Sequence, residues 1–241
     1  MEIRSSLVGI VTGASQGIGF AVANYLASKG YHLLLVSRDY TNLKDAADKI
    51  TNDHACVVPP AIAAIDVCDY EKVKESVENF VSKVGRVDLL CNSAGYVKRG
   101  SSDLPHDEFL KMINTNLIGT FNFIQTVSHY MKKNKSGRII NIVSRSGKIA
   151  RKQLGGYAAS KFGVMGLNES IYKELACYGI YVTAICPNLV ATAMTSDVNL
   201  DQNEMIKTDD IVKTLDYLLN ISPAVAIKEI VMECRAKLIE E

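Results

Sequence analysis

The stretch Thr12-Gly13-Ala14-Ser15-Gln16-Gly17-Ile18-Gly19 decides the fold of this 241-residue chain. It follows an apolar run at residues 7–11 and precedes a segment with helical spacing at residues 20–29. Glycines between a strand and a helix permit a tight turn and let the backbone approach a ligand closely. The free N–H groups that open the helix favour an anion there. The stretch therefore predicts a strand–turn–helix unit that holds the pyrophosphate of a dinucleotide. A turn that only packs the helix against the strand is the alternative.

Short apolar runs alternate with helical patterns along the rest of the chain. The apolar runs cover residues 33–36, 57–65, 87–91, 139–143, 181–185 and 224–232. The helical patterns cover residues 42–50, 71–84, 107–131, 157–177 and 209–219. Unbroken apolar strands separated by helices indicate a parallel sheet that is covered on both faces. The chain is therefore predicted to be a single doubly wound α/β domain over residues 1–241, with a mostly parallel seven-stranded sheet. The least patterned stretch, residues 193–207, is the predicted substrate loop.

Composition and charge exclude several classes of protein. The chain has 27 basic and 26 acidic residues, so its net charge of +1 does not favour nucleic acid or an anionic membrane. None of the six cysteines forms a Cys-x-x-Cys pair and the four histidines do not cluster beside them, so no metal site is expected. No apolar run approaches the 18 or so residues of a membrane span, and Met1–Arg4 do not resemble a signal peptide. We therefore expect a soluble, cytoplasmic protein.

The residues after the second apolar run indicate which dinucleotide binds. An acidic residue there holds the ribose 2′-hydroxyl of NAD, whereas an arginine suits the 2′-phosphate of NADP. The chain has Ser37-Arg38-Asp39, in which Asp39 comes one place late and is expected to face solvent or cap the next helix. Gln16 in the glycine turn is neutral, so Arg38 is the one basic residue available. NADP is thus favoured over NAD.

A tyrosine and a lysine four residues apart share one face of a helix. An ammonium group near a phenol favours the phenolate and lowers its pKa. Four pairs have this spacing: Tyr25 with Lys29, Tyr40 with Lys44, Tyr70 with Lys74, and Tyr157 with Lys161. Only Tyr157 follows a strand-like run that ends in a hydroxyl residue, Ser144. Tyr157 is therefore the candidate proton donor, and Ser144 is the candidate partner of a substrate oxygen.

Several motifs occur in a characteristic order along the chain. They are Thr12-Gly13-x3-Gly17-x-Gly19, Asp66-Val67, Asn92-Ser93-Ala94-Gly95, Asn116, Ser144, Tyr157-x3-Lys161 and Pro187…Thr192. In this order and spacing, the chain resembles the short-chain dehydrogenase/reductase family in its compact form. The resemblance spans nearly the whole chain.

The resemblance implies a catalytic set of four residues. Tyr157 would be the general acid in carbonyl reduction, and Ser144 would polarise the carbonyl. Lys161 would lower the pKa of Tyr157 and hold the nicotinamide ribose. Asn116 would hold a water in the proton relay.

The resemblance also implies the cofactor contacts. They are the turn residues Gly13, Ser15, Gln16, Gly17, Ile18 and Gly19; Ser37 and Arg38 at the ribose phosphate; Asp66 and Val67 at the adenine; Asn92, Ala94 and Gly95 along the cofactor; Tyr157 and Lys161 at the ribose; and Pro187, Asn188, Val190 and Thr192 at the carboxamide. By position, Tyr96, Ser146, Gln153 and Met194 would face the substrate. Relatives also imply a homodimer or homotetramer.

The chain departs from the family pattern at three places. Ser93 replaces a second asparagine, and Asn188 replaces a glycine. The usual glycine-rich end is replaced by the charged residues 233–241, which are expected to be exposed. Four basic residues lie between Ser144 and Tyr157, where they either form an ordinary charged loop or attract an anionic substrate group: Arg145, Lys148, Arg151 and Lys152.

The sequence thus predicts an NADPH-dependent reductase of a ketone or aldehyde, such as a 3-oxoacyl thioester or another small carbonyl. An NAD-dependent alcohol or hydroxysteroid dehydrogenase is the enzymatic alternative. A non-catalytic dinucleotide sensor or scaffold is the alternative from another class, and it would be expected to lack part of the catalytic set.

Overall fold

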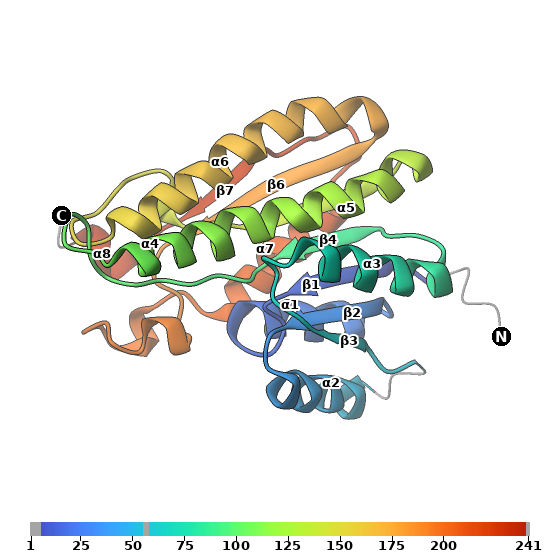
Figure 1. Ribbon diagram of the computed structural model, residues 1–241, viewed down its shortest axis with the longest axis horizontal. Helices are drawn as coiled ribbons and strands as arrows, with labels where there is room; N and C mark the ends of the chain where they lie inside the picture. The colour runs from blue at the N-terminus through green and yellow to red at the C-terminus, as the bar shows by residue number, and fades with distance from the viewer. Residues whose placement is uncertain (1–5, 55–57, 240–241) are drawn as a thin grey trace.

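Strand β1 (Val8–Thr12) lies inside a seven-stranded parallel sheet with the order β3-β2-β1-β4-β5-β6-β7. The computed structural model describes residues 6–54 and 58–239 (Figure 1). The other strands are β2 (His32–Ser37), β3 (Ala61–Ala64), β4 (Leu89–Asn92), β5 (Gly137–Ile142), β6 (Ile180–Pro187) and β7 (Glu229–Met232). The predicted fold class is confirmed.

Helices cover both faces of the sheet because the strands are apolar on both sides. Helices α1 (Gly17–Ser28), α2 (Tyr40–His54) and α7 (Thr208–Asn220) pack in one core cluster. Helices α3 (Tyr70–Val84), α5 (Gly119–Asn134) and α6 (Gly155–Leu175) pack in the second (Figure 1). Successive strands are added on one side of β1 as far as β3 and on the other side from β4 onward, so the two halves of the sheet meet between β1 and β4. Ligands of such sheets bind at the carboxyl ends of the strands at that point.

The predicted helix over residues 107–131 is not a continuous α-helix. It consists of α4 (His106–Met112), a π-helical segment η2 (Ile113–Ile118) and α5. A π-helical turn rotates the following side chains relative to an α-helix, and such turns are frequent at functional sites. The candidate residue Asn116 lies within η2 and is fully buried.

Two predicted strands are shorter than the apolar runs suggested. β3 begins only after Pro59-Pro60, since proline has no N–H to donate to a sheet ladder. Val57 lies outside the described residues. β7 is limited to Glu229–Met232, so the apolar residues that precede it form a connecting segment.

Cysteine burial follows the sequence expectation. Cys91 and Cys186 are fully buried in β4 and β6, while Cys56 lies outside the described residues. Across residues 6–54 and 58–239, no three or more histidine, cysteine or acidic side chains are grouped as metal ligands would be. No helix in that part of the chain is long and apolar enough to cross a bilayer.

The expectation of an exposed chain end is only partly correct, since Arg235 and Leu238 are exposed but the two residues at its start are not. Cys234 is buried and the Glu233 side chain is only 25% exposed, although this end of the chain was expected to lie in solvent. Arg145 is buried and pairs with Glu233, and Lys148 pairs with Glu229. Both cations thus have a carboxylate partner in the same chain, which favours the ordinary charged loop over an anion-binding role for them. A short helix, α8 (Arg235–Ile239), follows Cys234.

Candidate active site

The glycine turn after β1 packs tightly because two of its glycines leave no room for a side chain. A Cβ atom on Gly13 would lie 2.9 Å from the backbone nitrogen of Ala94, and one on Gly19 would overlap the carbonyl oxygen of Gly13. Gly13 also has a φ of +65°, which favours glycine. The Thr12 hydroxyl accepts the N–H groups of Ser93 and Ala94 at 3.0 and 3.1 Å. These contacts join the turn to the segment after β4.

Gly17 is the least crowded of the three glycines in the turn. It has a φ of +57°, and its nearest side chain is Thr192, whose Cγ2 would lie 3.4 Å from a Cβ at this position. Helix α1 begins at Gly17, so the unpaired N–H groups of its first turn lie there. The predicted residues Gly17, Ile18 and Thr192 thus meet at the start of a helix, which suits a pyrophosphate.

A cavity of about 330 Å³ lies beside the turn, between α1 and α2. Its lining residues are Ser15, Gln16, Phe20, Asn42, Asp45, Ala46 and Lys49. The Ser15 and Ser37 hydroxyls lie 3.0 Å apart, so the turn meets the end of β2 as predicted. Lys49 was missed by the sequence analysis. Its spacing from Asn42, Asp45 and Ala46 places all four on one face of α2, which is the signal that could have found it.

Arg38 and Asp39 follow β2 and are both exposed. Asp39 accepts the backbone N–H of Asn42 at 2.8 Å and so caps α2, which confirms one of the two expectations for it. Within the described residues, no ion pair with a carboxylate engages Arg38. Its guanidinium is thus available to an anion.

The two predicted adenine contacts differ in accessibility. Asp66 is exposed and accepts the N–H of Cys68 at 2.9 Å. Val67 is buried, and its Cγ2 atom fills the space that a Cβ of Gly119 would need. The Val67 carbonyl accepts the Asn122 amide at 2.9 Å. Only Asp66 of this pair presents a side chain to the surface.

Asn92 at the end of β4 begins a buried chain of amides. Its Nδ2 donates to Asn141 at 2.9 Å, and Asn141 in turn donates to Asn168 at 2.9 Å. The Asn92 Oδ1 atom is buried and has no hydrogen-bond partner among the described residues. An orphaned buried acceptor is rare and suits a site where a ligand supplies the donor.

The Ser144 and Tyr157 hydroxyls are hydrogen-bonded to each other, although 13 residues separate them in sequence. Ser144 ends the segment after β5, and Tyr157 lies in the first turns of α6. The Ser144 Oγ accepts the Ser146 N–H at 3.0 Å. Burial raises the pKa of Tyr157 above its usual value, while the hydrogen bond with Ser144 lowers it by less. The net direction is opposite to that expected from the neighbouring lysine.

Lys161 is a buried cation within the site. It is 5% exposed, its Nζ donates to the Ile142 carbonyl at 3.1 Å, and it lies 5.8 Å from the centre of the Tyr157 ring. Burial lowers the pKa of Lys161 to about 8, and the nearby Cys186 opposes this shift. An ammonium group has three hydrogens to donate, and the Ile142 carbonyl takes one of them, so the group can also bind ligand hydroxyls.

The Asn116 side chain holds the segment after β4 in place. Its Oδ1 accepts the Tyr96 N–H at 2.7 Å, and its Nδ2 donates to the Tyr96 carbonyl at 2.9 Å and to Ser160 at 2.8 Å. Both amide hydrogens are therefore used. Any water that Asn116 holds must act as a donor to one of its oxygens.

Two of the four predicted catalytic residues, Asn116 and Lys161, meet at Gly95. A Cβ atom on Gly95 would lie 3.5 Å from Asn116 Oδ1, 3.9 Å from Lys161 Nζ and 3.9 Å from Met194 Cε. These residues come from the segment after β4, from η2, from α6 and from the short helix η5 (Ala193–Thr195). The structure thus brings these distant candidates together around Gly95.

The segment after β6 adopts a fixed conformation. The Asn188 N–H donates to Met232 O at 2.8 Å, next to the pairing of Pro187 with Met232. The Val190 carbonyl accepts the Thr195 hydroxyl at 2.6 Å, and Thr192 caps η5. The predicted Val190 contact to a carboxamide would therefore have to share this carbonyl or use the backbone N–H.

The four candidate substrate residues have different surroundings. Tyr96 donates to Glu108 at 2.7 Å, and Lys111 lies over its ring. Ser146 is buried and supports Ser144 through its N–H. Met194 is 46% exposed beside Gly95. Gln153 is exposed and has a φ of +63°, a strained value for a residue with a side chain, and its carbonyl accepts the Gly100 N–H at 2.8 Å.

The residues present fit a dinucleotide. Gly17 lies at a helix start, an orphaned acceptor lies at Asn92, and a buried ammonium lies beside Gly95. Each adjoins the carboxyl end of a neighbouring strand: Gly17 follows β1, Asn92 ends β4, and Lys161 binds the carbonyl of Ile142, which ends β5.

Comparison with known proteins gives concordant results. The family model described as short chain dehydrogenase matches residues 8–203. An uncharacterized oxidoreductase of Staphylococcus saprophyticus is 35% identical over 92% of this chain and 95% of its own length. The crystal structure of a betaketoacyl-[ACP] reductase (FabG) from Bacteroides thetaiotaomicron has a TM-score of 0.87 and 37% identity, covering 97% of this chain and 99% of that one. Actinorhodin polyketide ketoreductase with NADPH has a TM-score of 0.86 and 26% identity, covering 97% of both chains.

Proposed function

The chain belongs to the short-chain dehydrogenase family and is an oxidoreductase, and we propose that it uses NADPH to reduce a ketone or aldehyde to an alcohol. The observation that carries the proposal is the hydrogen-bonded pair of Ser144 and Tyr157 beside the buried Lys161. A non-catalytic sensor would not need to retain this set. An NAD-dependent alcohol dehydrogenase, the enzymatic alternative, would use the same catalytic residues. The two hypotheses differ in whether Arg38 binds a ribose phosphate.

Ser144, Tyr157 and Lys161 have different roles in the proposed proton transfer. NADPH, when bound, supplies the hydride. Ser144 receives a hydrogen bond from the Ser146 N–H, which orients its own hydrogen towards an oxygen. A phenol has an ordinary pKa of about 10, and burial raises the pKa of Tyr157 further, so Tyr157 is protonated near neutrality and can donate to the oxygen that becomes the alcohol. Lys161 lies close enough to favour the phenolate that this donation leaves.

The fate of the proton follows from the same contacts. The positive charge of Lys161 stabilises the tyrosinate only while the lysine is protonated. Water that reaches the site through the ribose hydroxyls and an oxygen of Asn116 would return a proton to Tyr157. This role of Asn116 is part of the proposal, and it uses an oxygen because the amide hydrogens are already engaged.

The pH dependence of reduction is the first test. Lys161 is charged below its pKa of about 8 and neutral above it. Tyr157, whose pKa is raised, keeps its proton over the same range. We therefore expect kcat/KM for carbonyl reduction to be level below pH 8 and to fall above it, as measured by loss of nicotinamide absorbance. The residual rate of Lys161→Met should lack this decline. A rate that rises through pH 8 would contradict the assignment.

Preference for NADPH is proposed from one cation after the end of β2 and one in the cavity beside the glycine turn. Arg38 is exposed after Ser37, and Lys49 lines the cavity beside Ser15 and Gln16. The polyketide ketoreductase with NADPH, which is similar to this chain, supports the same choice.

Removal of Arg38 should change the preference for the dinucleotide. We expect Arg38→Ala to weaken NADPH binding about tenfold and to leave NADH binding nearly unchanged, since one exposed charge-assisted contact to the phosphate is lost. Fluorescence titration with both dinucleotides measures this. Lys44→Ala is the matched control, because Lys44 lies on α2 but pairs with Asp48 in solvent. Equal loss for both dinucleotides would instead favour the NAD-dependent alternative.

A 3-oxoacyl thioester is the proposed substrate, because one of the similar solved structures is a betaketoacyl-[ACP] reductase that is 37% identical to this chain. Other small carbonyls are the competing substrates. A panel of an acetoacetyl thioester, a diketone, an aromatic aldehyde and a ketosteroid distinguishes them.

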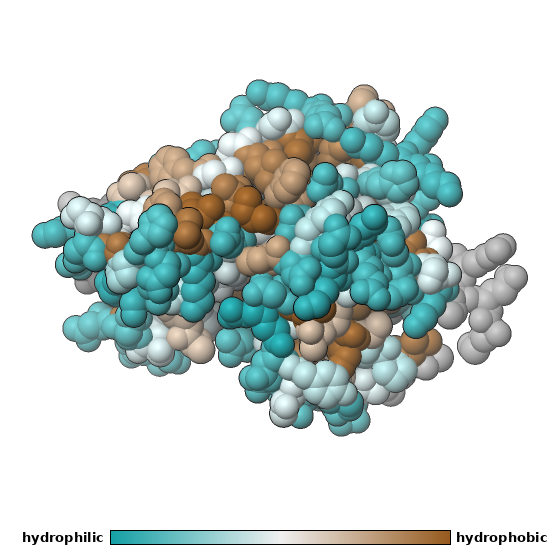
Figure 2. Space-filling view, in the orientation of Figure 1, coloured by the Kyte–Doolittle hydropathy of each residue, from teal (hydrophilic) through white to brown (hydrophobic). Residues whose placement is uncertain are grey.

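We also propose a cytoplasmic homo-oligomer, a dimer or tetramer. Its support is the hydrophobic surface over α5 and α6 (Figure 2), to which the exposed Phe121 and Phe162 contribute.

A further inference from the structure

Glu233 connects two segments of the site that are far apart in sequence. Its Oε1 lies 2.5 Å from Arg145 Nε, and its Oε2 accepts the Asn188 amide at 2.9 Å. Arg145 directly follows Ser144, and Asn188 opens the segment that leads to Thr192. Asn188 and Glu233 both lie where the chain departs from the family pattern, and the structure shows that they contact each other.

The short helix that begins at Arg145 connects Glu233 to the catalytic residues. Turn η3 (Arg145–Gly147) holds the Ser144 hydroxyl through the Ser146 N–H. On its other side, a Cβ on Gly147 would lie 2.9 Å from the Lys161 carbonyl oxygen, so the turn packs directly on α6. A shift of η3 would therefore move Ser144 relative to Tyr157 and Lys161.

The residue after Glu233 adds a contact to the predicted substrate loop. The buried Cys234 donates to the Glu204 carbonyl at 3.0 Å. Residues 233 and 234 thus contact η3, the segment after β6 and the loop at residues 193–207. The side chains of Arg145 and Glu233 are only 9% and 25% exposed, so the ion pair between them is largely shielded from water.

We propose that Glu233 is a positioning residue that fixes the Ser144 turn and the Asn188 segment relative to each other. This rests on the proposed function, because the two segments hold the proton donor's partner and the cofactor contacts. Glu233 touches neither substrate nor cofactor. It acts through Arg145 on the Ser144 hydroxyl and through Asn188 on the residues that lead to Thr192.

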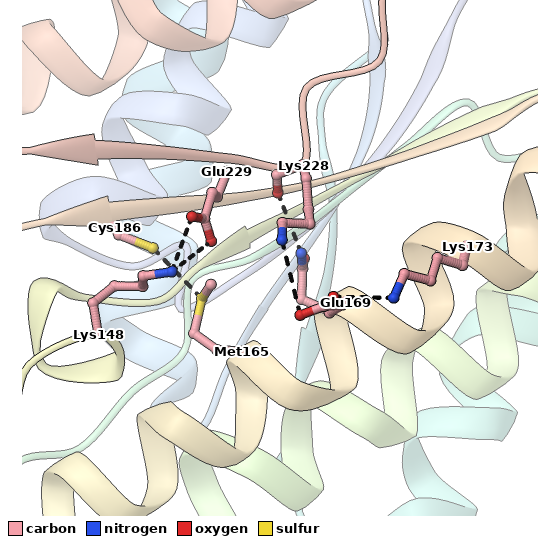
Figure 3. Close-up of polar contacts among 8 residues, drawn as sticks. Lys148, Met165, Glu169, Lys173, Cys186, Lys228 and Glu229 are labelled. Carbon is pink, nitrogen blue, oxygen red and sulfur yellow. Dashed lines mark hydrogen bonds and ion pairs between the residues drawn. The ribbon is translucent and has the colours of Figure 1, made fainter.

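A second ion pair on the same turn provides the matched control. Lys148 pairs with Glu229 at 2.9 Å (Figure 3). Lys148 is 36% exposed against 9% for Arg145, whereas Glu229 and Glu233 are about equally buried. Glu229 begins β7 and Glu233 directly follows this strand, so the two carboxylates reach the loop after Ser144 from one edge of the sheet. Loss of the Lys148 pair should have the smaller effect, because Lys148 keeps its access to water.

The test compares Glu233→Gln with Glu229→Gln in the full chain. Amide hydrogen exchange should accelerate in Glu233→Gln at residues 144–148 and again at 188–195, and remain near wild type at 188–195 in Glu229→Gln. In steady-state assays kcat of Glu233→Gln should fall on the order of tenfold, since misplacement of reacting groups is costly. Unchanged exchange at both segments, or equal effects of the two variants, would overturn the proposal.

Two additions keep the outcomes separate. Asn188→Gly removes only the contact between the Asn188 amide and Glu233 and keeps the Arg145 ion pair. It should therefore accelerate exchange at 188–195 and leave exchange at 144–148 unchanged, and it provides a test even if Glu233→Gln does not fold. Acceleration at both segments in Asn188→Gly would contradict separate actions of Glu233 through Arg145 and through Asn188. Hydrogen exchange needs no substrate. If the wild-type protein reduces no carbonyl, the proposed function fails while exchange still decides whether Glu233 joins the two segments.

Discussion

Tyr157→Phe should lower the rate of carbonyl reduction by at least a hundredfold while dinucleotide affinity stays close to that of the wild type. A positioned general acid contributes about 10²- to 10⁴-fold, and phenylalanine keeps the ring but removes the proton. The hydroxyl interacts with Ser144 rather than with the glycine turn, so the binding surface stays intact. Steady-state rates and a fluorescence titration of the same preparation measure the two effects.

Tyr40→Phe is the matched control for that experiment. Tyr40 also has a lysine four residues later, but it opens α2 and is 59% exposed. Its replacement should change neither rate nor affinity. If Tyr157→Phe retains most of the turnover, then Tyr157 is not the acid, and another donor must supply the proton.

Gly95→Ala should weaken dinucleotide binding about tenfold or more without unfolding the protein. Its new Cβ would make only ordinary contacts of 3.5–3.9 Å with Asn116, Lys161 and Met194, so the fold accommodates it. The same atom would lie among these three side chains, where the cofactor is proposed to bind. Overfilling a fitted site typically costs about 1–3 kcal/mol, which corresponds to a tenfold to hundredfold loss of affinity. Titration and thermal unfolding separate the two quantities.

Gly166→Ala controls for the substitution itself. Gly166 lies on α6, where an added methyl group would meet no atom of the described residues within 4 Å, and alanine is the better helix former. This variant should be slightly more stable and bind the dinucleotide normally. Normal binding by Gly95→Ala would show that the cofactor does not occupy the space at Gly95.

The sequence predicts the parts of the site that depend on local patterns. The strand–turn–helix unit at Gly13–Gly19 follows from glycine placement, and the parallel sheet follows from the unbroken apolar runs. Because the carboxyl ends of parallel strands meet at one edge, Ser144 and Tyr157 could be expected to come together. The structure confirms the fold and this pairing.

Contacts between distant segments could not be predicted in this way. The π-helical turn that buries Asn116 results from packing against Tyr96 and Ser160, and no periodicity in residues 107–131 indicates it. The Arg145–Glu233–Asn188 contacts join three segments whose register depends on the pairing of β6 with β7. Sequence spacing alone placed Glu233 in solvent for this reason.

The electrostatic expectation at Tyr157 illustrates the same limit. The helical spacing correctly places Lys161 near the ring, at 5.8 Å. Burial, however, has the larger effect on the phenol and raises its pKa. The degree of burial depends on the packing of α6 against β6, η2 and η3, which the two residues themselves do not specify.

The most direct test of the proposed function mixes the purified protein with NADPH and an acetoacetyl thioester and follows the absorbance of the reduced nicotinamide. The absorbance should fall steadily as the 3-hydroxy thioester forms, and Tyr157→Phe should show only a small residual rate. Tight binding of NADPH with no turnover of any carbonyl in the panel would contradict the proposed function and favour a dinucleotide sensor.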